Sequence, residues 1–312
     1  MSESSNGQNE IVSFPVYTEG GGLQIIPKAV KTIESPKIPE APQLINQFAE
    51  LAAASLAYAR KKTESNREHL ADSGSRAIKK IVGQGVEIIK TGDPENALNF
   101  LYNCLEQYRI RVCVPLSASE LNPSEAGNFA GLYLSLLNEA KHPGQKQKDN
   151  PQLREFEKKV IQSSTYREKF ERLKQSVEGH LEEFSQGALA ELIFFNLSLQ
   201  AGLNPEFSSP HRDTKGHIDY FIHPRGKEIK IQVKSNKYLG EPEIKKLSDG
   251  RWLVVVGAPP LDLNDSRVAE YYRRILFPKK EEAEKFGRSF ETANSQPEQP
   301  YIPARFRVKV PA

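Results

Sequence analysis

The chain has 312 residues, 38% of them hydrophobic, and a formal net charge of +3. This length is enough for one large domain or two ordinary ones, and the mild positive charge permits a nucleic-acid partner without arguing for one. No apolar run is long enough to span a bilayer, and "MSESSNGQNE" lacks the basic and apolar regions of a signal peptide. We therefore expect a cytoplasmic protein with no membrane partner.

Two cysteines, Cys104 and Cys113, lie apart in the sequence without CxxC spacing. Isolated cysteines of this kind indicate reduced, buried thiols in a cytoplasmic protein. No local signature marks either of them as a nucleophile.

The first 41 residues are rich in Gly, Pro and Ser, as in "TEGGGLQ" and "IESPKIPEAPQ". This composition and the lack of periodicity predict a disordered or extended arm over residues 1–41. A short strand at "QIIPKAV" is the regular element that the pattern allows there.

Over residues 42–180 apolar residues recur at helical spacing, which predicts a mainly α-helical region. Asp93 and Asn122 each precede a proline, as helix caps do, and Gly92 is a natural helix stop. The last helical pattern runs from "TYREKF" to "LQAGL", and a break near residues 185–187 would divide it into two helices. We expect this region to bind substrate, to hold a partner or to form a homodimer.

After this region the pattern changes to that of strands. Four strands are predicted, at "NPEFSS", at the two arms of "GHIDYFIHPRGKEIKIQVKSN" and at the continuous apolar run "RWLVVVGAPP". A helix capped by Asp265 follows in "DSRVAEYYRRILF", and "ARFRVKV" would add an edge strand. Residues 181–312 are therefore expected to form an α/β fold, a mixed sheet of about four to five strands flanked by helices.

The two arms of the hairpin predict a register. With a two-residue turn at residues 225–226, apolar residues lie opposite apolar ones and Asp219 lies opposite Gln232. Because side chains alternate along a strand, Asp219, Gln232 and Lys234 then share one face.

The order of these elements and the residues on them resemble a known family. The segment from about residue 183 to 278, roughly a third of the chain, resembles the PD-(D/E)XK nuclease superfamily, the restriction-endonuclease-like fold. That core has a helix with a glutamate, a hairpin arm with an aspartate and a second arm with a (Glu/Gln)-x-Lys motif. The matching residues are Glu191 in "GALAELIFF", Asp219 in "HIDYF", and Gln232 and Lys234 in "IQVKS". The chain departs from the pattern in lacking a proline before Asp219, and Gln replaces the acidic residue of the motif.

The resemblance implies a metal-dependent nuclease that uses Mg²⁺, or Mn²⁺ as a substitute, and prefers DNA to RNA. A restriction or defence endonuclease, a repair nuclease and a toxin all fit this description. Asp219 would anchor the metal, and the side-chain carbonyl of Gln232 and the backbone carbonyl of Val233 would add neutral ligands. Glu191 would bind a second metal or a metal-bound water. Lys234 would orient the attacking water or neutralise charge on the phosphate.

Residues beside the motif offer groups for contacts with a nucleic acid: His217, Ser235, Asn236 and Lys237. The nearby loop residues Arg212, Asp213 and Lys215 are interpreted as lying at the mouth of the site. The histidines around the first arm, His211, His217 and His223, match no standard zinc spacing.

Two other functions fit the sequence. A catalytically inactive protein of this fold would bind nucleic acid without cutting it, and Gln232 favours this alternative because it removes a negative charge from the metal site. Alternatively, the helices form a protein-interaction module, the C-terminal domain is a scaffold, and Lys234→Ala is tolerated. The nuclease hypothesis requires the Glu191 and Asp219 carboxylates and the Lys234 ammonium to converge in one place.

Overall fold

The computed structural model describes residues 10–17, 23–30, 42–141, 150–209, 212–213 and 216–294. The chain divides into two compact units, unit 1 being Met1–Arg67 with Leu105–Leu181, and unit 2 being Glu68–Cys104 with Glu182–Ala312. Unit 2 thus contains the helical segment Glu68–Cys104 together with the region predicted to be α/β. Within the described ranges, no helix has the length and apolar character needed to cross a membrane.

The arm before the first helix contains two strands, β1 (Glu10–Tyr17) and β2 (Leu23–Val30), which pair antiparallel. The short strand that the pattern allowed at "QIIPKAV" is confirmed as part of β2, whereas β1 was not predicted. Its sequence, "EIVSFPVY", is rich in the β-branched and aromatic residues that favour strands, despite its proline.

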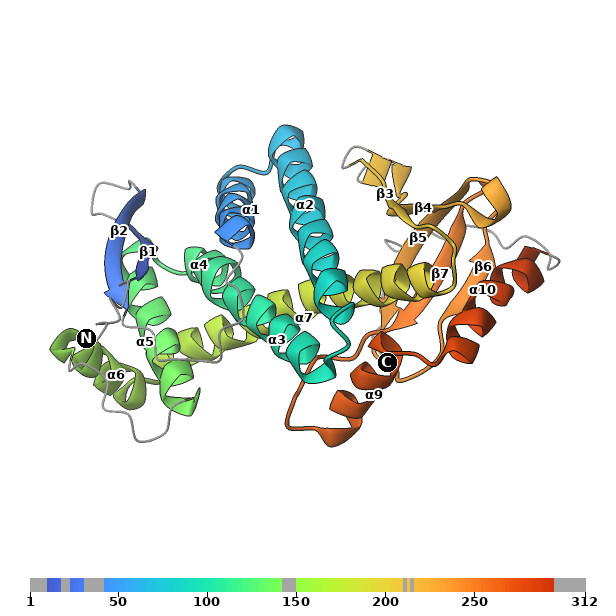
Figure 1. The fold of residues 1–312 in the computed structure, drawn as a ribbon. Coiled ribbons are helices and arrows are strands. Elements are labelled where there is room, and N and C mark those ends of the chain that lie inside the picture. The colour runs from blue at the N-terminus through green and yellow to red at the C-terminus, as the bar shows by residue number, and fades with distance from the viewer. Residues whose placement is uncertain are drawn as a thin grey trace, which may run out of the picture. The chain divides into compact units, whose positions relative to one another are not determined.

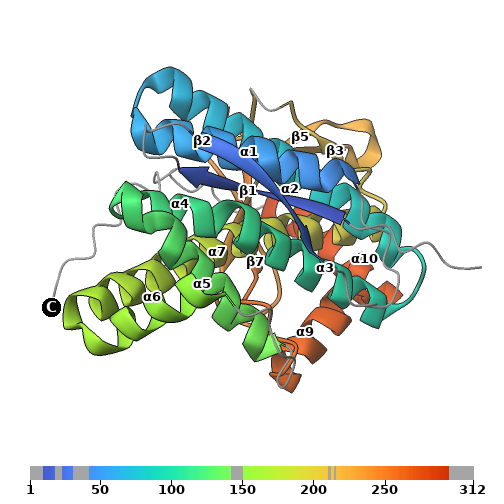
Figure 2. The ribbon, with the colours of Figure 1, turned by 90° about the vertical axis from the view of Figure 1, so that its left-hand side faces the viewer.

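Unit 1 is otherwise helical. Its elements are α1 (Pro42–Arg60), the end of α3 (Pro94–Tyr108), a π-helical turn (Arg109–Cys113), α4 (Val114–Ser119), α5 (Pro123–Lys141), α6 (Pro151–Gln162) and the first part of α7 (Ser164–Gln200). Figure 2 shows α5 and α6 side by side. The fully buried ring of Phe129 joins α5, α6 and α7, because its centroid lies 4.9 Å from that of Phe156 and 6.4 Å from that of Phe170.

The predicted helix ends are confirmed where capping signals mark them. Asp93 accepts hydrogen bonds from the backbone N–H of Glu95 and Asn96, and Gly92 has a φ of +78°, the left-handed conformation of a helix stop. The break predicted at residues 185–187 is wrong, since α7 is one helix. Gly187 weakens a helix by about 1 kcal/mol, and burial of the residues after it outweighs that cost.

Unit 2 contains a five-stranded mixed sheet flanked by helices, as predicted. Its strands are β3 (Glu206–Phe207), β4 (Tyr220–Ile222), β5 (Ile229–Asn236), β6 (Glu243–Lys246) and β7 (Trp252–Gly257), and its helices include α2 (Glu64–Ile89), α9 (Ser266–Leu276) and α10 (Lys280–Asn294). The strand order is β3-β4-β5-β7-β6, in which β5 and β7 are parallel and the other neighbours antiparallel. Figure 1 shows α10 beside the edge strand β6.

The hairpin register is confirmed. Tyr220 pairs with Ile231 and Ile222 with Ile229. The turn closes with a 3.1 Å hydrogen bond from the Lys227 N–H to the Pro224 carbonyl, and its Gly226 has a φ of +80°. Both faces of β5 are buried at residues 231–233, so Gln232 on the polar face is covered, while Lys230 and Lys234 on either side of it are exposed.

Two elements of unit 2 were not predicted. The edge strand β6 is only four residues long, which is too short for a reliable alternation. Helix α10 does carry a helical signal, because its buried Ala283, Phe286 and Phe290 recur at helical spacing. The predicted strand "ARFRVKV" lies outside the described residues.

Helix α7 is fixed to the sheet by aromatic packing. The ring centroid of Phe194 lies 5.3 Å from that of Tyr220 on β4 and 6.3 Å from that of Phe286 on α10. The Asn196 side chain donates a 2.8 Å hydrogen bond to the Leu276 carbonyl at the end of α9. This packing fixes the position of Glu191, one turn earlier on α7.

Candidate functional site

Asp219 lies directly before β4, at the edge of the β4–β5 pairing. Beyond the last residue pair, Tyr220 with Ile231, the Asp219 side chain takes over the role of a backbone acceptor. Its Oδ2 accepts a 2.6 Å hydrogen bond from the Val233 N–H. The carboxyl is therefore buried and held against β5, as a metal-anchoring residue would need to be.

Glu191 reaches the same place from α7. Its Oε2 accepts a 2.7 Å hydrogen bond from the Tyr220 hydroxyl. Burial raises the pKa of Glu191 to about 7 and the charge of Asp213 adds to this rise, while the Tyr220 hydrogen bond and the charges of Lys79 and Lys234 oppose it. A glutamate with this pKa carries a proton for part of the time at neutral pH.

The carboxyls act on one another. Burial raises the pKa of Asp219 well above its usual value, and the negative charges of Glu191 and Asp213 and a hydrogen bond with the Asp213 carboxyl raise it further. The Val233 N–H acts in the opposite direction. Carboxylates that repel each other in a buried place are typical of sites in which a cation supplies the missing positive charge.

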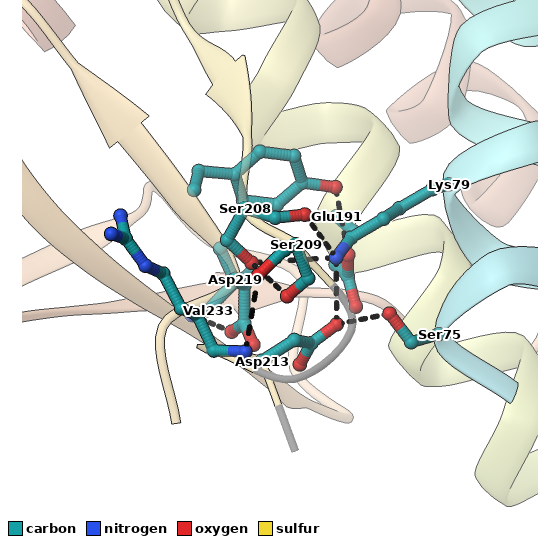
Figure 3. A network of polar contacts seen from close by, with 10 residues as sticks. Ser75, Lys79, Glu191, Ser208, Ser209, Asp213, Asp219 and Val233 are labelled. Atoms are coloured by element: carbon teal, nitrogen blue, oxygen red, sulfur yellow. Dashed lines mark hydrogen bonds and ion pairs between the residues drawn. The ribbon is translucent and has the colours of Figure 1, made fainter. Parts of the chain in front are cut away.

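Helix α2 supplies part of the positive charge beside these carboxyls (Figure 3). The Lys79 Nζ lies 3.0 Å from Asp213 Oδ2 and donates a 2.8 Å hydrogen bond to the Ser208 carbonyl. Ser75, one turn earlier, donates a hydrogen bond to the same Asp213 oxygen. The cluster therefore contains three carboxyls, from Glu191, Asp213 and Asp219, and one nearly buried lysine.

Sequence reasoning missed both α2 residues and assigned Asp213 only to the mouth of the site. The α2 residues are distant in sequence from the hairpin, so no local motif includes them. One signal was available, because Ser75 and Lys79 stand in the same helical stripe as the buried Val82 and Val86. Polar side chains in a buried stripe need partners and so point to a polar site.

The two residues of the QxK motif have different environments. Gln232 is buried, and its Oε1 accepts a long 3.5 Å hydrogen bond from Arg251 Nη1. The middle position of the motif therefore faces a cation. Lys234, two residues on and on the same face, is exposed, and its charge lowers the pKa of Glu191. Glu191 and Asp219 belong to one polar network of unit 2 (Figure 3), and the charge of Lys234 acts on Glu191. Convergence of all three groups at one metal site stays a prediction.

The predicted nucleic-acid contacts lie at both ends of this cluster. His217 adopts a left-handed φ of +50°, its carbonyl accepts a 3.2 Å hydrogen bond from Arg251, and burial lowers its pKa. At the end of β5, Ser235 is partly buried and Asn236 Oδ1 accepts a hydrogen bond from the next loop. Lys237 pairs with Glu182 at 2.5 Å. Contact of these four residues with a nucleic acid stays a prediction, and His211 and Lys215 lie outside the described residues.

The oxygen ligands available here suit Mg²⁺, which keeps several water ligands, better than a metal whose ligands are all protein side chains. In the part of the chain that the structure describes, no three His, Cys, Asp or Glu side chains are arranged to hold a metal ion directly. Asp213 and Glu191 both act on Asp219, whose pKa they raise. Mg²⁺ usually takes one or two carboxylates and keeps several waters. Asp219 could hold it directly, with Glu191 reaching it through a water molecule.

A cavity of about 110 Å³ lies elsewhere in unit 2, lined by residues that include Leu197, Ile275 and Phe286. Its lining contains none of the carboxylates or lysines described above. The candidate site is therefore the polar cluster around Asp219 and not this cavity.

Comparisons of the chain with protein-family models, with curated proteins and with solved structures found no match. The functional proposal therefore depends on the residues of unit 2 and their geometry.

Proposed function

We propose that the protein is a metal-dependent nuclease of the PD-(D/E)XK type, which hydrolyses phosphodiester bonds in DNA. The observation that supports this proposal is that Glu191 from α7 and Asp219 from the hairpin lie in one polar network, Glu191 bound by the Tyr220 hydroxyl and Asp219 by the Val233 N–H, one residue before Lys234. Burying carboxylates beside one another costs free energy unless a cation compensates them. A functional site explains why the fold tolerates that cost.

The chain's own residues have distinct roles in this proposal. Asp219, fixed by the Val233 N–H, would hold Mg²⁺, with Glu191 reaching it through water. A bound Mg²⁺ supplies a low-pKa water and stabilises negative charge on the phosphate. Lys234 is exposed beside the cluster, where its ammonium can donate to a phosphate oxygen and neutralise developing charge. Gln232 would contact the metal only if its carbonyl left Arg251.

Cleavage assays test this function. The purified protein is incubated with supercoiled plasmid, single-stranded DNA and RNA, in Mg²⁺, in Mn²⁺ and in EDTA. We expect metal-dependent cleavage of DNA that falls by about a hundredfold or more in Asp219→Ala. Glu228→Ala, which removes an exposed carboxylate of the same hairpin, is the matched control and should cleave like the wild type. Cleavage that persists in EDTA or in Asp219→Ala would contradict the proposal.

A second function is favoured by two contacts. Arg251 holds the Gln232 carbonyl, and Lys79 already lies against a carboxylate of the cluster. Both contacts suit a protein that binds nucleic acid without cutting it. That function predicts salt-dependent DNA binding that Asp219→Ala leaves unchanged, and no product with any metal. Electrophoretic shift assays at two salt concentrations, run beside the cleavage assay, separate the two functions.

A further inference from the structure

The Lys79 ammonium contacts two further oxygen atoms besides its ion-pair partner Asp213. Its Nζ lies 3.0 Å from Asp213 Oδ2, 2.8 Å from the Ser208 carbonyl and 3.3 Å from Ser208 Oγ. An ammonium has three donors, and these three oxygens can occupy all of them. Only 12% of the Lys79 side chain is exposed, and its Nζ lies among these three oxygens.

The oxygens around Lys79 are of the kinds that bind hard divalent cations. Carboxylate, backbone carbonyl and neutral oxygen atoms make up the usual ligand sets of Mg²⁺ and Ca²⁺. Asp213 also acts on Asp219, and the charge of Lys79 acts on Glu191. Figure 3 shows the Lys79 ammonium among Ser208, Asp213 and Glu191. The ammonium thus provides positive charge at the edge of the proposed metal site.

We propose that Asp213 is a third ligand of the metal site and that Lys79 is its built-in counter-ion, which a divalent cation must displace. Because Ser75 and Lys79 bind the same Asp213 oxygen, α2 keeps that oxygen occupied until the cation enters. This inference depends on the proposed function, since it takes the metal to bind at Asp219 and Glu191. It goes further by naming a ligand and a competitor that the QxK motif does not contain.

Metal affinity, measured without substrate, tests this inference. Isothermal titration calorimetry with MnCl₂ gives the dissociation constants of the wild type, Lys79→Met and Asp213→Asn. We expect Lys79→Met to bind Mn²⁺ at least about tenfold more tightly, because a repelling unit charge beside the ligands is gone. Asp213→Asn should bind at least about tenfold more weakly. Lys90→Met is the control, since Lys90 follows α2 and pairs with the exposed Glu87.

The outcomes separate this inference from the function on which it depends. If Lys79→Met binds Mn²⁺ no more tightly than the wild type while Asp219→Ala loses binding, Lys79 does not compete with the metal. The proposed metal site at Asp219 is then still supported. If Asp219→Ala does not change the affinity, or if neither the wild type nor Lys79→Met binds Mn²⁺, both the inference and the metal-dependent function fail. Should Lys79→Met not fold, Lys79→Gln keeps a donor to Ser208 without the charge, and the same comparison applies.

Discussion

The Tyr220 hydroxyl donates a 2.7 Å hydrogen bond to Glu191 Oε2 and links the first hairpin strand to α7. The Tyr220 ring is fully buried between Phe194 and Phe195 of α7, with centroids 5.3 Å and 5.5 Å away. The hydroxyl therefore cannot turn away without disturbing the core. One buried aromatic residue thus fixes the carboxylate that the proposed metal site needs.

Replacing Tyr220 by Phe tests this relationship. The change removes the donor and keeps the ring, so the pKa of Glu191, which this hydrogen bond lowers, should rise further above about 7. Loss of one hydrogen bond to a buried acceptor should reduce the free energy of unfolding by about 1–2 kcal/mol. NMR titration of the ¹³C-labelled glutamate carboxyls measures the pKa, and Tyr238→Phe, at an exposed tyrosine, is the control. An unchanged Glu191 titration would show that the hydrogen bond has no effect on its charge.

The stability of the metal-free protein should depend on pH through Glu191. Its pKa is raised from the usual 4.5 to about 7, so between these values the folded chain keeps a proton that the unfolded chain has lost. The free energy of unfolding then decreases as pH rises from about 4.5 to 7. The upper limit is about 3 kcal/mol, because one pKa unit corresponds to about 1.4 kcal/mol and part of the residue is exposed.

Urea unfolding in EDTA between pH 4.5 and 8 measures this dependence. Glu191→Gln should flatten the decline, since it removes the titrating group, and the comparison with the wild type cancels the contributions of other carboxyls. Equal slopes for the two proteins would contradict the assigned pKa. Asp219, whose pKa is also raised, should leave a residual decline in the variant.

The hairpin, β7 and the start of α9 were predictable because local sequence patterns determine them. The alternation of the two hairpin arms excludes a one-residue slip, and the two-residue turn then selects the register in which Tyr220 pairs with Ile231. The apolar run at β7 and the Asp265 cap of α9 were equally clear, and the Asp265 side chain accepts the 2.9 Å hydrogen bond from the Arg267 N–H. Local chemistry determined these elements.

The rest of the site depended on tertiary contacts that no local pattern reports. Lys79 meets Asp213 only because α2 packs on α7, and Gly85 makes this approach close: a Cβ there would lie 3.0 Å from Leu192. The environment of Gln232 depended on Arg251, which stands outside the QxK motif. In both cases the residue type indicated polar chemistry, and the partner came from another element.

Gly257 at the end of β7 should not accept a side chain. A Cβ at this position would lie 2.3 Å from the Tyr238 carbonyl and 2.7 Å from the Tyr271 hydroxyl. Because the nearest atom is backbone, the loop after β5 would have to move. We expect Gly257→Ala to lower the free energy of unfolding by about 1–3 kcal/mol. Thermal unfolding measures it, with Gly127→Ala as the control because a Cβ there meets nothing within 4 Å. Equal stability of the two variants would show that the loop gives way freely.

Lys234 and Lys230 provide a matched pair for the catalytic role. Both are exposed on β5 and, being four residues apart on a strand, both point to the same face. Lys234 directly follows Val233, whose N–H binds Asp219, and its charge acts on Glu191, whereas Lys230 lies three residues before Val233. We therefore expect Lys234→Ala to lower kcat for DNA cleavage by about 10²-fold or more, because the developing charge on the phosphate loses its donor.

Lys230→Ala should retain kcat, and both variants should keep the stability of the wild type. Lys234→Ala should also keep Mn²⁺ affinity or increase it, since Lys234 repels a cation and is not a ligand. Single-turnover cleavage and calorimetry on the same preparations separate the two effects. Equal loss of cleavage in both variants would indicate that positive charge on this face only attracts DNA. An unchanged cleavage rate in Lys234→Ala would show that Lys234 has no catalytic role.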